Sequence, residues 1–163
     1  MDPVEFERQL KGQQKGLNEL SVADFIANRD QYIALSIKNK SLNKKGGGRA
    51  PQGSVAQLRE RKKALKAKVD ELRLQTPSLT KDQAEIEANK WLKTQTALHD
   101  PDQIAGGHAA HITGMGDKRV NSAIGGAWPS RIEGIDKQIR DYAKTMTPNE
   151  QATTYLNVIL PIA

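Results

Sequence analysis

Residues 131–146 read Arg-Ile-Glu-Gly-Ile-Asp-Lys-Gln-Ile-Arg-Asp-Tyr-Ala-Lys-Thr-Met. The apolar residues in this stretch recur at alternating intervals of three and four, the spacing that places side chains on one face of a helix. They are Ile132, Ile135, Ile139, Tyr142 and Met146. A similar stripe consists of Leu58, Leu65, Val69 and Leu72, and a poorer one consists of Ala84, Ala88, Trp91, Gln95 and Leu98. No segment alternates apolar and polar residues as convincingly, so the sequence predicts a mainly α protein.

Helix starts are marked by capping boxes, in which a Ser, Thr or Asp is followed three residues later by Glu or Gln. The two side chains accept hydrogen bonds from backbone N–H groups that the first turn leaves without partners. Complete boxes begin at Ser54, Thr80, Asp100, Ser130 and Thr147, and a weaker one begins at Ser21. These signals and the stripes predict helices over residues 3–15, 22–38, 55–75, 81–99, 101–105, 118–124, 131–146 and 148–159. Residues 157–163 are a candidate edge strand for which the sequence shows no partner.

A basic, glycine-rich segment divides the chain. The 163 residues fit one domain, and the three consecutive glycines beside two lysines at 44–48 favour an irregular loop. We therefore predict an N-terminal helical extension over 1–39, a basic Gly-rich loop over 40–53 and the main functional domain over 54–163. The expected architecture is a compact, multi-helix single domain whose site lies in irregular Gly-rich loops, because five glycines lie between residues 106 and 125, beside all three histidines.

The composition excludes several classes of protein. The chain has no cysteine, which excludes disulfides, a cysteine nucleophile and a thiolate zinc site. No apolar run approaches the ~20 residues of a membrane-spanning helix, and residues 1–8 lack the pattern of a signal peptide. The net charge is +6, but residues 38–73 alone hold twelve Lys or Arg and three acidic residues. This basic segment indicates a polyanionic or acidic protein partner, and a solvated helix face is the alternative.

The sequence Leu98-His99-Asp100-Pro101-Asp102 combines an imidazole with two carboxylates. Pro101 disfavours helical geometry at Asp100, so we expect the preceding helix to end near His99 and Asp100 to cap a short new one. The bend would turn His99 and Asp102 toward one pocket, where the imidazole can accept a proton and the carboxylate can hold a divalent cation. These parts suffice for metal-assisted phosphodiester hydrolysis. In the simpler alternative, each side chain only complements a helix dipole.

Other residues near this sequence indicate a functional site less clearly. His108 and His111 have the spacing of half a zinc site, but no third ligand is evident, so a polar loop is the favoured interpretation. Residues 113–119 would present backbone N–H groups and two cations to a phosphate at a helix start, although they match no P-loop pattern. Trp128 precedes a proline and is more typical of a core residue than of a base-stacking platform.

Two segments of the chain contain recognisable motifs. They are Ala97-Leu-His-Asp-Pro-Asp-Gln-Ile-Ala-Gly-Gly107 and Gly116-Asp-Lys-Arg-Val-Asn-Ser-Ala-Ile-Gly-Gly-Ala-Trp128. In this order they resemble the polymorphic toxin type 15 domain, the HxxD nuclease toxin family of type VI secretion DNase effectors of the Tde type. The resemblance covers roughly residues 48–145. It implies an antibacterial, metal-dependent DNase without marked sequence specificity, which a cognate immunity protein neutralises in the producing cell.

The resemblance also implies roles for individual residues. His99 would be the general base that activates water, and Asp102 would hold a divalent cation, Mg²⁺, against the scissile phosphate. Asp117 is the expected second metal ligand, with Asp100 as an alternative carboxylate. The residues expected to contact nucleic-acid phosphates are Lys44, Lys45, Arg49, Arg59, Arg61, Lys62, Lys118, Arg119 and Arg131. The expected supporting residues are Asp100, Asn121, Ser122 and Trp128.

The expected partners are DNA, the immunity protein and a carrier or chaperone of the secretion apparatus. The chain would be the toxin end of a longer effector, delivered by a contact-dependent secretion system without a signal peptide, and would act in the cytoplasm of the target bacterium. Two alternatives stay open. RNA is an alternative substrate, because no reader of the 2′-hydroxyl group is identifiable. A basic helical domain that binds nucleic acid, or acts as an adaptor, without catalysis is the alternative from another class.

Overall fold

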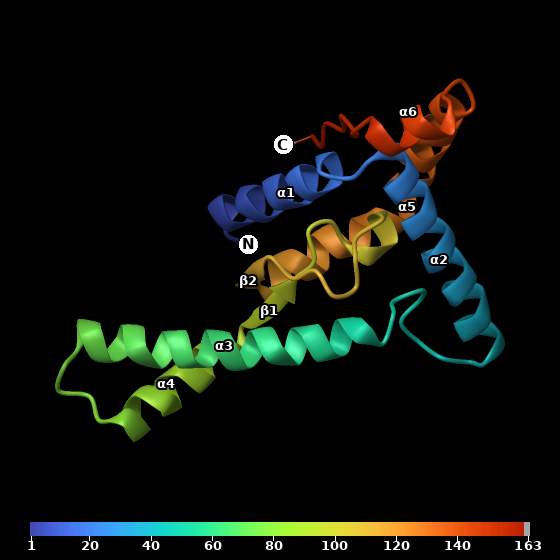
Figure 1. The fold of residues 1–163 in the computed structure, drawn as a ribbon. Helices are drawn as coiled ribbons and strands as arrows, with labels where there is room; N and C mark the ends of the chain where they lie inside the picture. Colours follow the sequence, from blue (N-terminus) through green and yellow to red (C-terminus); the bar gives the residue numbers. More distant parts are fainter. Residues whose placement is uncertain (162–163) are drawn as a thin grey trace.

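The computed structural model describes residues 1–161 and confirms the mainly α fold (Figure 1). The helices in this part of the chain are α1 (Pro3–Asn18), α2 (Val22–Ser41), α3 (Gln52–Gln75), α4 (Lys81–Lys93), α5 (Lys118–Ala143) and α6 (Pro148–Thr153). Between α4 and α5 lie the strands β1 (Gln95–Leu98) and β2 (Gly114–Asp117) and the short 3₁₀ helix η1 (Gln103–Ala105). No helix within residues 1–161 combines the length and the apolar character needed to cross a membrane.

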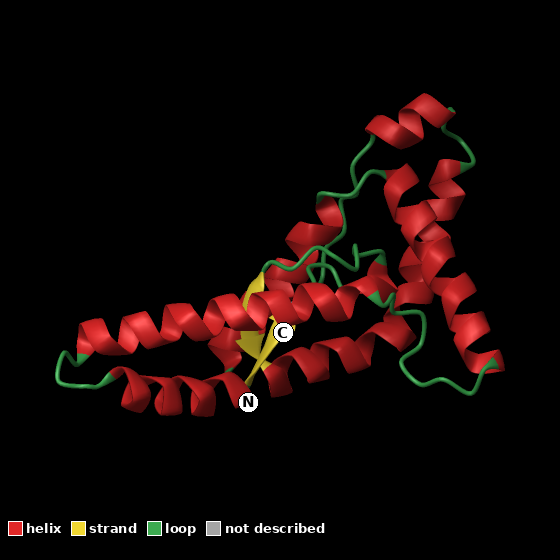
Figure 2. Ribbon diagram, turned by 60° about the horizontal axis from the view of Figure 1, so that its bottom comes forward, coloured by secondary structure: helices red, strands yellow, loops and turns green. Residues whose placement is uncertain are grey.

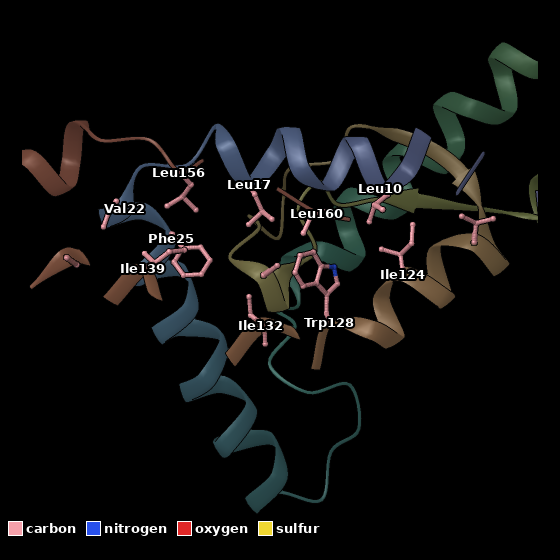
Figure 3. Packing of buried hydrophobic residues seen from close by; sticks show 13 residues of the cluster. Leu10, Leu17, Val22, Phe25, Ile124, Trp128, Ile132, Ile139, Leu156 and Leu160 are labelled. Carbon is pink, nitrogen blue, oxygen red and sulfur yellow. The ribbon is translucent and has the colours of Figure 1, made fainter. Parts of the chain in front are cut away.

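One hydrophobic core joins α1, α2, α5 and the segment after α6 (Figure 3). Leu17 of α1 and Phe25 of α2 are completely buried in the same cluster as Trp128 and Ile132 of α5. Burying side chains of this size contributes ~1.5–3 kcal/mol each, so α1 and α2 are integral to the stability of the domain. Residues 1–39, expected as an extension, therefore share one core with the rest of the domain.

Helix α5 is a single helix where the sequence predicted two, over 118–124 and 131–146. Pro129 lies inside it and donates no hydrogen bond to the turn before it, which normally favours a helix end. The predicted capping box at Ser130 is wrong, because this residue lies within the helix. The helix continues because Ile124, Trp128 and Ile132 form one uninterrupted buried stripe on both sides of the proline.

Helices α3 and α4 form a hairpin that projects from the core (Figure 2). Val69 of α3 packs against Ala84 and Ala88 of α4 in a small second cluster. The capping box at Thr80 is confirmed at the start of α4, as are the box at Thr147 and the cap at Ser21. The predicted cap at Ser54 is wrong, because α3 begins two residues earlier, at Gln52.

Helix α4 ends at Lys93, not at residue 99 as predicted, because the next residues join a two-stranded antiparallel sheet. Gln95 pairs with Asp117, and Leu98 pairs with Gly114. A glycine in β2 permits a close approach to α1, since a Cβ atom at Gly116 would lie 2.6 Å from Nε2 of Gln9. The sheet closes the base of the loop 99–113, which holds all three histidines.

The C-terminal segment runs extended along α1 (Figure 1). Helix α6 ends at Thr153 instead of near residue 159. The N–H of Val158 donates to Oδ1 of Asn18 at 2.7 Å, and the N–H of Leu160 donates to Oε1 of Gln14 at 2.8 Å. The candidate edge strand is wrong over 157–161, where these side-chain amides replace a partner strand. The last two residues of that candidate, 162 and 163, lie outside the described residues.

Candidate active site around His99 and Asp102

The loop 99–113 begins with the His99–Asp102 sequence directly after β1. The N–H of Thr113 donates to the carbonyl of Leu98 at 3.0 Å, which extends the closure made by the two strands. Inside the loop, the N–H of Gly107 donates to the carbonyl of Asp102 at 3.0 Å. The turn requires Gly106, whose φ of 93° lies in the left-handed region that glycine adopts without strain. A short, closed loop of this kind holds its first residues in fixed positions.

The side-chain amide of Gln13, in α1, holds the His99–Asp102 turn through its hydrogen bonds. Nε2 of Gln13 donates to the carbonyl of His99 at 2.7 Å and to Oδ1 of Asp100 at 2.8 Å. Oε1 of Gln13 accepts from the N–H of Asp102 at 2.8 Å and from Nε1 of Trp128 at 3.2 Å. Both amide protons and both oxygen lone pairs are thereby used. One buried side chain therefore fixes the backbone on both sides of Pro101.

Two glycines allow α1 to lie directly on this turn. A Cβ atom at Gly16 would lie 2.1 Å from the carbonyl oxygen of Asp100, and one at Gly12 would lie 2.7 Å from Oδ2 of Asp100. Contacts this short are impossible for real side chains, so the helix backbone itself is the surface against which the turn packs. The approach brings Gln13, which lies between the two glycines, within hydrogen-bond distance of residues 99–102.

Asp100 is a structural residue in this arrangement. Its side chain is buried, with Oδ1 bonded to Gln13 and Oδ2 accepting from the hydroxyl of Thr113 at 2.5 Å. It does not cap the following short helix, as the sequence predicted, because Asp102 takes that position. Both oxygens of Asp100 are engaged in holding the two ends of the loop together, so its supporting role lies in the geometry of the loop.

The carboxylate of Asp102 faces the segment between α2 and α3. Oδ1 accepts from the N–H of Ile104 at 3.1 Å, which caps η1. NH2 of Arg49 lies 3.3 Å from Oδ1 and 3.2 Å from Oδ2. The Asp102 side chain is 16% exposed and that of Arg49 is 49% exposed, so solvent reaches the ion pair. On the other side α5 passes close by, since a Cβ atom at Gly125 would lie 3.7 Å from Oδ2.

The imidazole of His99 is oriented by a single carbonyl. Nε2 lies 2.8 Å from the carbonyl oxygen of Ala109, and a carbonyl oxygen can only accept, so Nε2 carries the proton. The lone pair of the neutral ring is therefore on Nδ1. Nε2 also lies 3.6 Å from the position of a Cβ atom at Gly53, in the first turn of α3. The ring is half-buried, between the loop and the start of α3.

Asp117 does not join Asp102 in one ligand set. Its Oδ1 caps α5 by accepting from the N–H groups of Arg119 and Val120 at 2.8 and 3.1 Å. Gly125, which lies beside Asp102, is about 12 Å further along α5 at ~1.5 Å per residue. Two carboxylates on one divalent cation would each lie ~2.0–2.6 Å from it. Accordingly, no cluster of three or more His, Asp or Glu side chains suited to a metal occurs within residues 1–161.

Asp102 by itself fits a hard cation. Its carboxylate already has a cationic partner, the exposed guanidinium of Arg49, which an ion could replace. Mg²⁺ is commonly held by one or two carboxylates, with water and substrate phosphate oxygens completing its shell. The residues therefore fit a single-carboxylate site, and they do not fit a site built from Asp102 and Asp117 together.

The backbone of Asp117 is held by Glu5 of α1. Oε1 of Glu5 accepts from the N–H of Asp117 at 3.1 Å, and the same carboxylate pairs with Arg8 at 2.6 Å. Hydrogen bonds from the Arg8 side chain are the main reason that the pKa of Glu5 is lowered to about 2, and bonds from Gln9 and Asp117 lower it further. The ionised carboxylate thus ties the first turn of α1 to the start of α5.

Comparison with known families identifies the domain. The sequence model of the Novel toxin 15 family (Ntox15) matches residues 1–161, nearly the whole chain. The chain belongs to this family of polymorphic toxin domains. A comparison with curated proteins finds no match. The match begins at residue 1, so it includes α1 and with it Gln13, which the resemblance over 48–145 left out.

The residues expected to bind phosphates fall in separate parts of the Ntox15 domain. Lys44 and Lys45 are exposed in the segment between α2 and α3, and Arg49 of the same segment contacts Asp102. Exposed positions on the helices are Arg59 and Lys62 on α3 and Lys118, Arg119 and Arg131 on α5. Arg61 differs, because it donates to the backbone carbonyls of Gln95 and Leu92 at 3.1 and 3.4 Å and so supports the fold.

The expected supporting residues have different surroundings. Trp128 is 2% exposed and belongs to the core, as the sequence favoured, and its indole N–H also contacts Gln13. Asn121 is half-buried on α5 one turn before Gly125, hence on the face that passes Asp102. Ser122 is exposed. His108 and His111 are exposed in the loop, outside any metal-ligating cluster of the described residues.

Sequence reasoning missed Gln13 and Gln103. Gln103 follows Asp102 and is 6% exposed, and its Oε1 accepts from the N–H of Ala50 at 2.9 Å. Gln13 belongs to no recognisable motif, and Gln103 is predicted only as the last residue of the capping box that begins at Asp100. The available signal for Gln13 was its position between Gly12 and Gly16, since glycines one turn apart in a helix indicate a close backbone approach.

Proposed function

We propose that this toxin domain is a metal-dependent nuclease that hydrolyses DNA phosphodiester bonds without marked sequence preference. The observation that carries the proposal is the amide of Gln13, which fixes His99 and Asp102 in one rigid turn. A general base and an ion-binding carboxylate need fixed relative positions to act on one phosphate. The ion pair between Arg49 and Asp102 adds a solvent-accessible cation at the same place, suited to an anionic substrate.

His99 acts as the general base through Nδ1. The hydrogen bond from Nε2 to the Ala109 carbonyl holds the ring and its tautomer, which leaves the lone pair on Nδ1 to take a proton from the attacking water. The same carbonyl stabilises the imidazolium that results, because the charged ring is a stronger hydrogen-bond donor.

Asp102 would hold a divalent cation beside the phosphate. The cation, when bound, neutralises the charge that develops on the phosphate. The guanidinium of Arg49, half-exposed beside Asp102, can donate two parallel hydrogen bonds to the DNA backbone. Lys44, Lys45 and Arg59 attract the polyanion at longer range, so binding weakens steeply as salt rises.

The biological role follows from the family. A polymorphic toxin acts on a competitor, so we infer delivery by a contact-dependent secretion system into the cytoplasm of the target bacterium, where the DNA lies. The producing cell needs a cognate immunity protein. A partner with an acidic surface complements the exposed basic residues between α2 and α3 and on α3, and would block the approach of DNA.

Plasmid nicking tests the proposal. With Mg²⁺ present, the purified chain is expected to nick supercoiled plasmid, and His99→Ala and Asp102→Ala are each expected to lower the rate by about 10²–10⁴-fold. EDTA should abolish nicking. His111→Ala is the matched control, because His111 is an exposed histidine of the same loop, and it should cut like the unmodified chain.

Two results would overturn the mechanism: nicking that persists in folded His99→Ala and Asp102→Ala variants, or nicking that EDTA leaves unchanged. A parallel assay on a structured RNA separates the two substrates. If the chain cleaves RNA but not DNA, RNA is the substrate. If the chain binds nucleic acid without cleaving it, the domain is a basic nucleic-acid-binding domain and not a nuclease.

A further inference from the structure

A cavity with a mainly apolar lining and several side-chain amides lies beside the proposed catalytic turn. Its volume is about 330 Å³, within the range of ~300–1,000 Å³ typical of ligand sites. One wall is α2, with Tyr32 and Leu35. The opposite walls are the segment 48–52, which leads into α3, and the loop segment 107–110. We call this cavity the amide pocket, after the side chains that line it.

The amide pocket carries no fixed charge. None of the residues that line it, all within the described part of the chain, is Asp, Glu, Lys or Arg, although such residues make up 27% of the sequence. Its polar side chains include four amides, those of Asn28, Gln31, Gln52 and Gln103. Amides offer donors and acceptors together, and a cavity without charge recognises a neutral polar group better than a phosphate or a metal ion.

Gln103 has a free donor at the pocket. The N–H of Ala50 donates to Oε1 of Gln103, which fixes the orientation of the amide, since only its oxygen can accept. No protein atom within residues 1–161 accepts a hydrogen bond from Nε2 of this side chain, and solvent reaches this nitrogen, since Nε2 is not among the fully buried side-chain atoms that lack a partner. The absence of a side chain at Gly53 leaves room for it, because a Cβ atom there would lie 3.0 Å from Nε2. Water can satisfy this donor in the free chain, and an acceptor atom of a ligand can take the place of that water.

The amide pocket and the catalytic turn share a wall. Ala109 lines the pocket, and its carbonyl oxygen receives the hydrogen bond from Nε2 of His99. Gln103 lines the pocket and follows Asp102 directly in the chain. A group bound in the pocket would therefore lie next to a phosphate held at His99 and Asp102.

We propose that the amide pocket binds the base of the nucleotide next to the scissile phosphate, with an acceptor atom of the base edge on Nε2 of Gln103. This proposal rests on the proposed nuclease function. A base can enter a cavity only when it is unstacked from its neighbours, so the nucleotide is single-stranded or flipped out of the duplex at the moment of cleavage. Any base offers at least one acceptor, which keeps sequence preference weak.

Cleavage of single-stranded oligodeoxynucleotides containing one abasic residue tests the proposal. The unmodified chain should cut the phosphate next to the abasic residue about 3–10-fold more slowly than the same phosphate in the intact strand, the effect of one lost hydrogen bond and its contacts. Leu35→Trp fills the pocket from the α2 wall. In this variant, intact and abasic strands should be cut at the same, reduced rate. Ile37→Trp, an exposed position of α2 outside the pocket, is the control and should keep the discrimination.

Binding of 2′-deoxynucleosides, which carry no phosphate, keeps this test separate from that of the nuclease function. In spectra of the ¹⁵N-labelled chain, deoxynucleosides at millimolar concentration should shift the side-chain amide signal of Gln103 in the unmodified protein and in Ile37→Trp, but not in Leu35→Trp. If no strand is cut but these shifts occur, the nuclease function fails and the base pocket stands. The pocket proposal is overturned if the Gln103 signal does not move, or if abasic and intact strands are cut equally by the unmodified chain.

Discussion

Gln13 has the largest influence of any single side chain on the geometry of the site. It is 3% exposed, and its amide bonds the backbone of His99, the backbone of Asp102 and the Trp128 indole. Nothing in the amide reacts with substrate, so its role is to position the groups that do. The cost of losing it is large because the partners stay buried without hydrogen bonds.

Gln13→Leu is expected to lower the free energy of unfolding by roughly 2–5 kcal/mol, since several buried polar groups lose their partner. It should also lower plasmid nicking by about 10²-fold at a temperature where the variant is fully folded, because the turn loses its fixed geometry. Gln14→Leu is the matched control, since its amide bonds the C-terminal segment and lies outside the turn. Equal nicking by the two folded variants would contradict a positioning role for Gln13.

The sequence pointed to the residues of the His99–Asp102 turn, but it did not predict the buried glutamine that holds this turn in place. His99 and Asp102 lie on either side of the Asp100–Pro101 pair, but the helix expected to end near His99 is replaced there by β1. The function of Asp100 could not be predicted, because its carboxylate bonds Gln13, which is distant in the sequence, and Thr113 at the other end of the loop. Asp117 caps α5, a role that its position directly before the predicted helix at 118 indicates. Gln13 is separated from the turn by 86 residues or more, and no local pattern encodes such a contact.

Among the helices, α2 and α5 are joined by a buried ion pair. Nε of Arg29 lies 3.0 Å from Oδ2 of Asp136, with both side chains at most 10% exposed. Arg29 also donates to the carbonyl of Ile104 at 2.6 Å, and Arg140 donates to the second oxygen of Asp136. The pair therefore links two helices to η1, the element that follows Asp102.

Asp136→Ala is expected to lower the free energy of unfolding by about 3–5 kcal/mol, because it leaves the buried guanidinium of Arg29 without its counter-charge. Urea unfolding measures the change. Asp141→Ala provides the control on the same helix, since Asp141 is exposed with Lys137 and Lys144, and a much smaller effect is expected. Similar losses in the two variants would show that burial of the Arg29–Asp136 pair contributes little.

The elements themselves could be predicted where local signals and packing agree. Thr80 and Thr147 start helices as their capping boxes indicate. The predictions were wrong where a contact with a distant segment determines the secondary structure. Residues 95–98 continue a helical pattern, yet they form a strand that pairs with residues 114–117. Pro129 lies inside α5 because the residues on both sides of it belong to one buried stripe. Sequence periodicity describes one helix face, whereas these outcomes depend on a partner segment elsewhere in the chain.

For the whole molecule, acid is expected to weaken the attachment of α1 to the start of α5. The pKa of Glu5 is about 2 in the folded chain, below the usual value of 4.5 for a glutamate. A carboxylate with a lowered pKa stabilises the fold above its unfolded pKa, and this contribution is lost as the pH falls toward the folded value. The loss should therefore occur between about pH 5 and pH 2.

Urea unfolding of the unmodified chain and of Glu5→Gln at pH 7, 5 and 3 tests this. The unmodified chain should be the more stable at pH 7, and its advantage should shrink as the pH falls to 3. Glu7→Gln serves as the control, because Glu7 is exposed and pairs with Lys11 on the same helix. An advantage of the unmodified chain over Glu5→Gln that stays constant from pH 7 to pH 3 would contradict the assignment.

The extended C-terminal segment along α1 affects when the domain can fold during its synthesis. Asn18 and Val158 are 140 residues apart in the chain, and Gln14 and Leu160 are 146 apart. Contacts of such long range close late in folding, because the intervening chain must be ordered first. Leu156 and Leu160 belong to the core that also buries Leu17 and Phe25, so a nascent polypeptide still on the ribosome lacks part of that core. The domain reaches its mature form only after residues 156–160 have been translated and have left the ribosome.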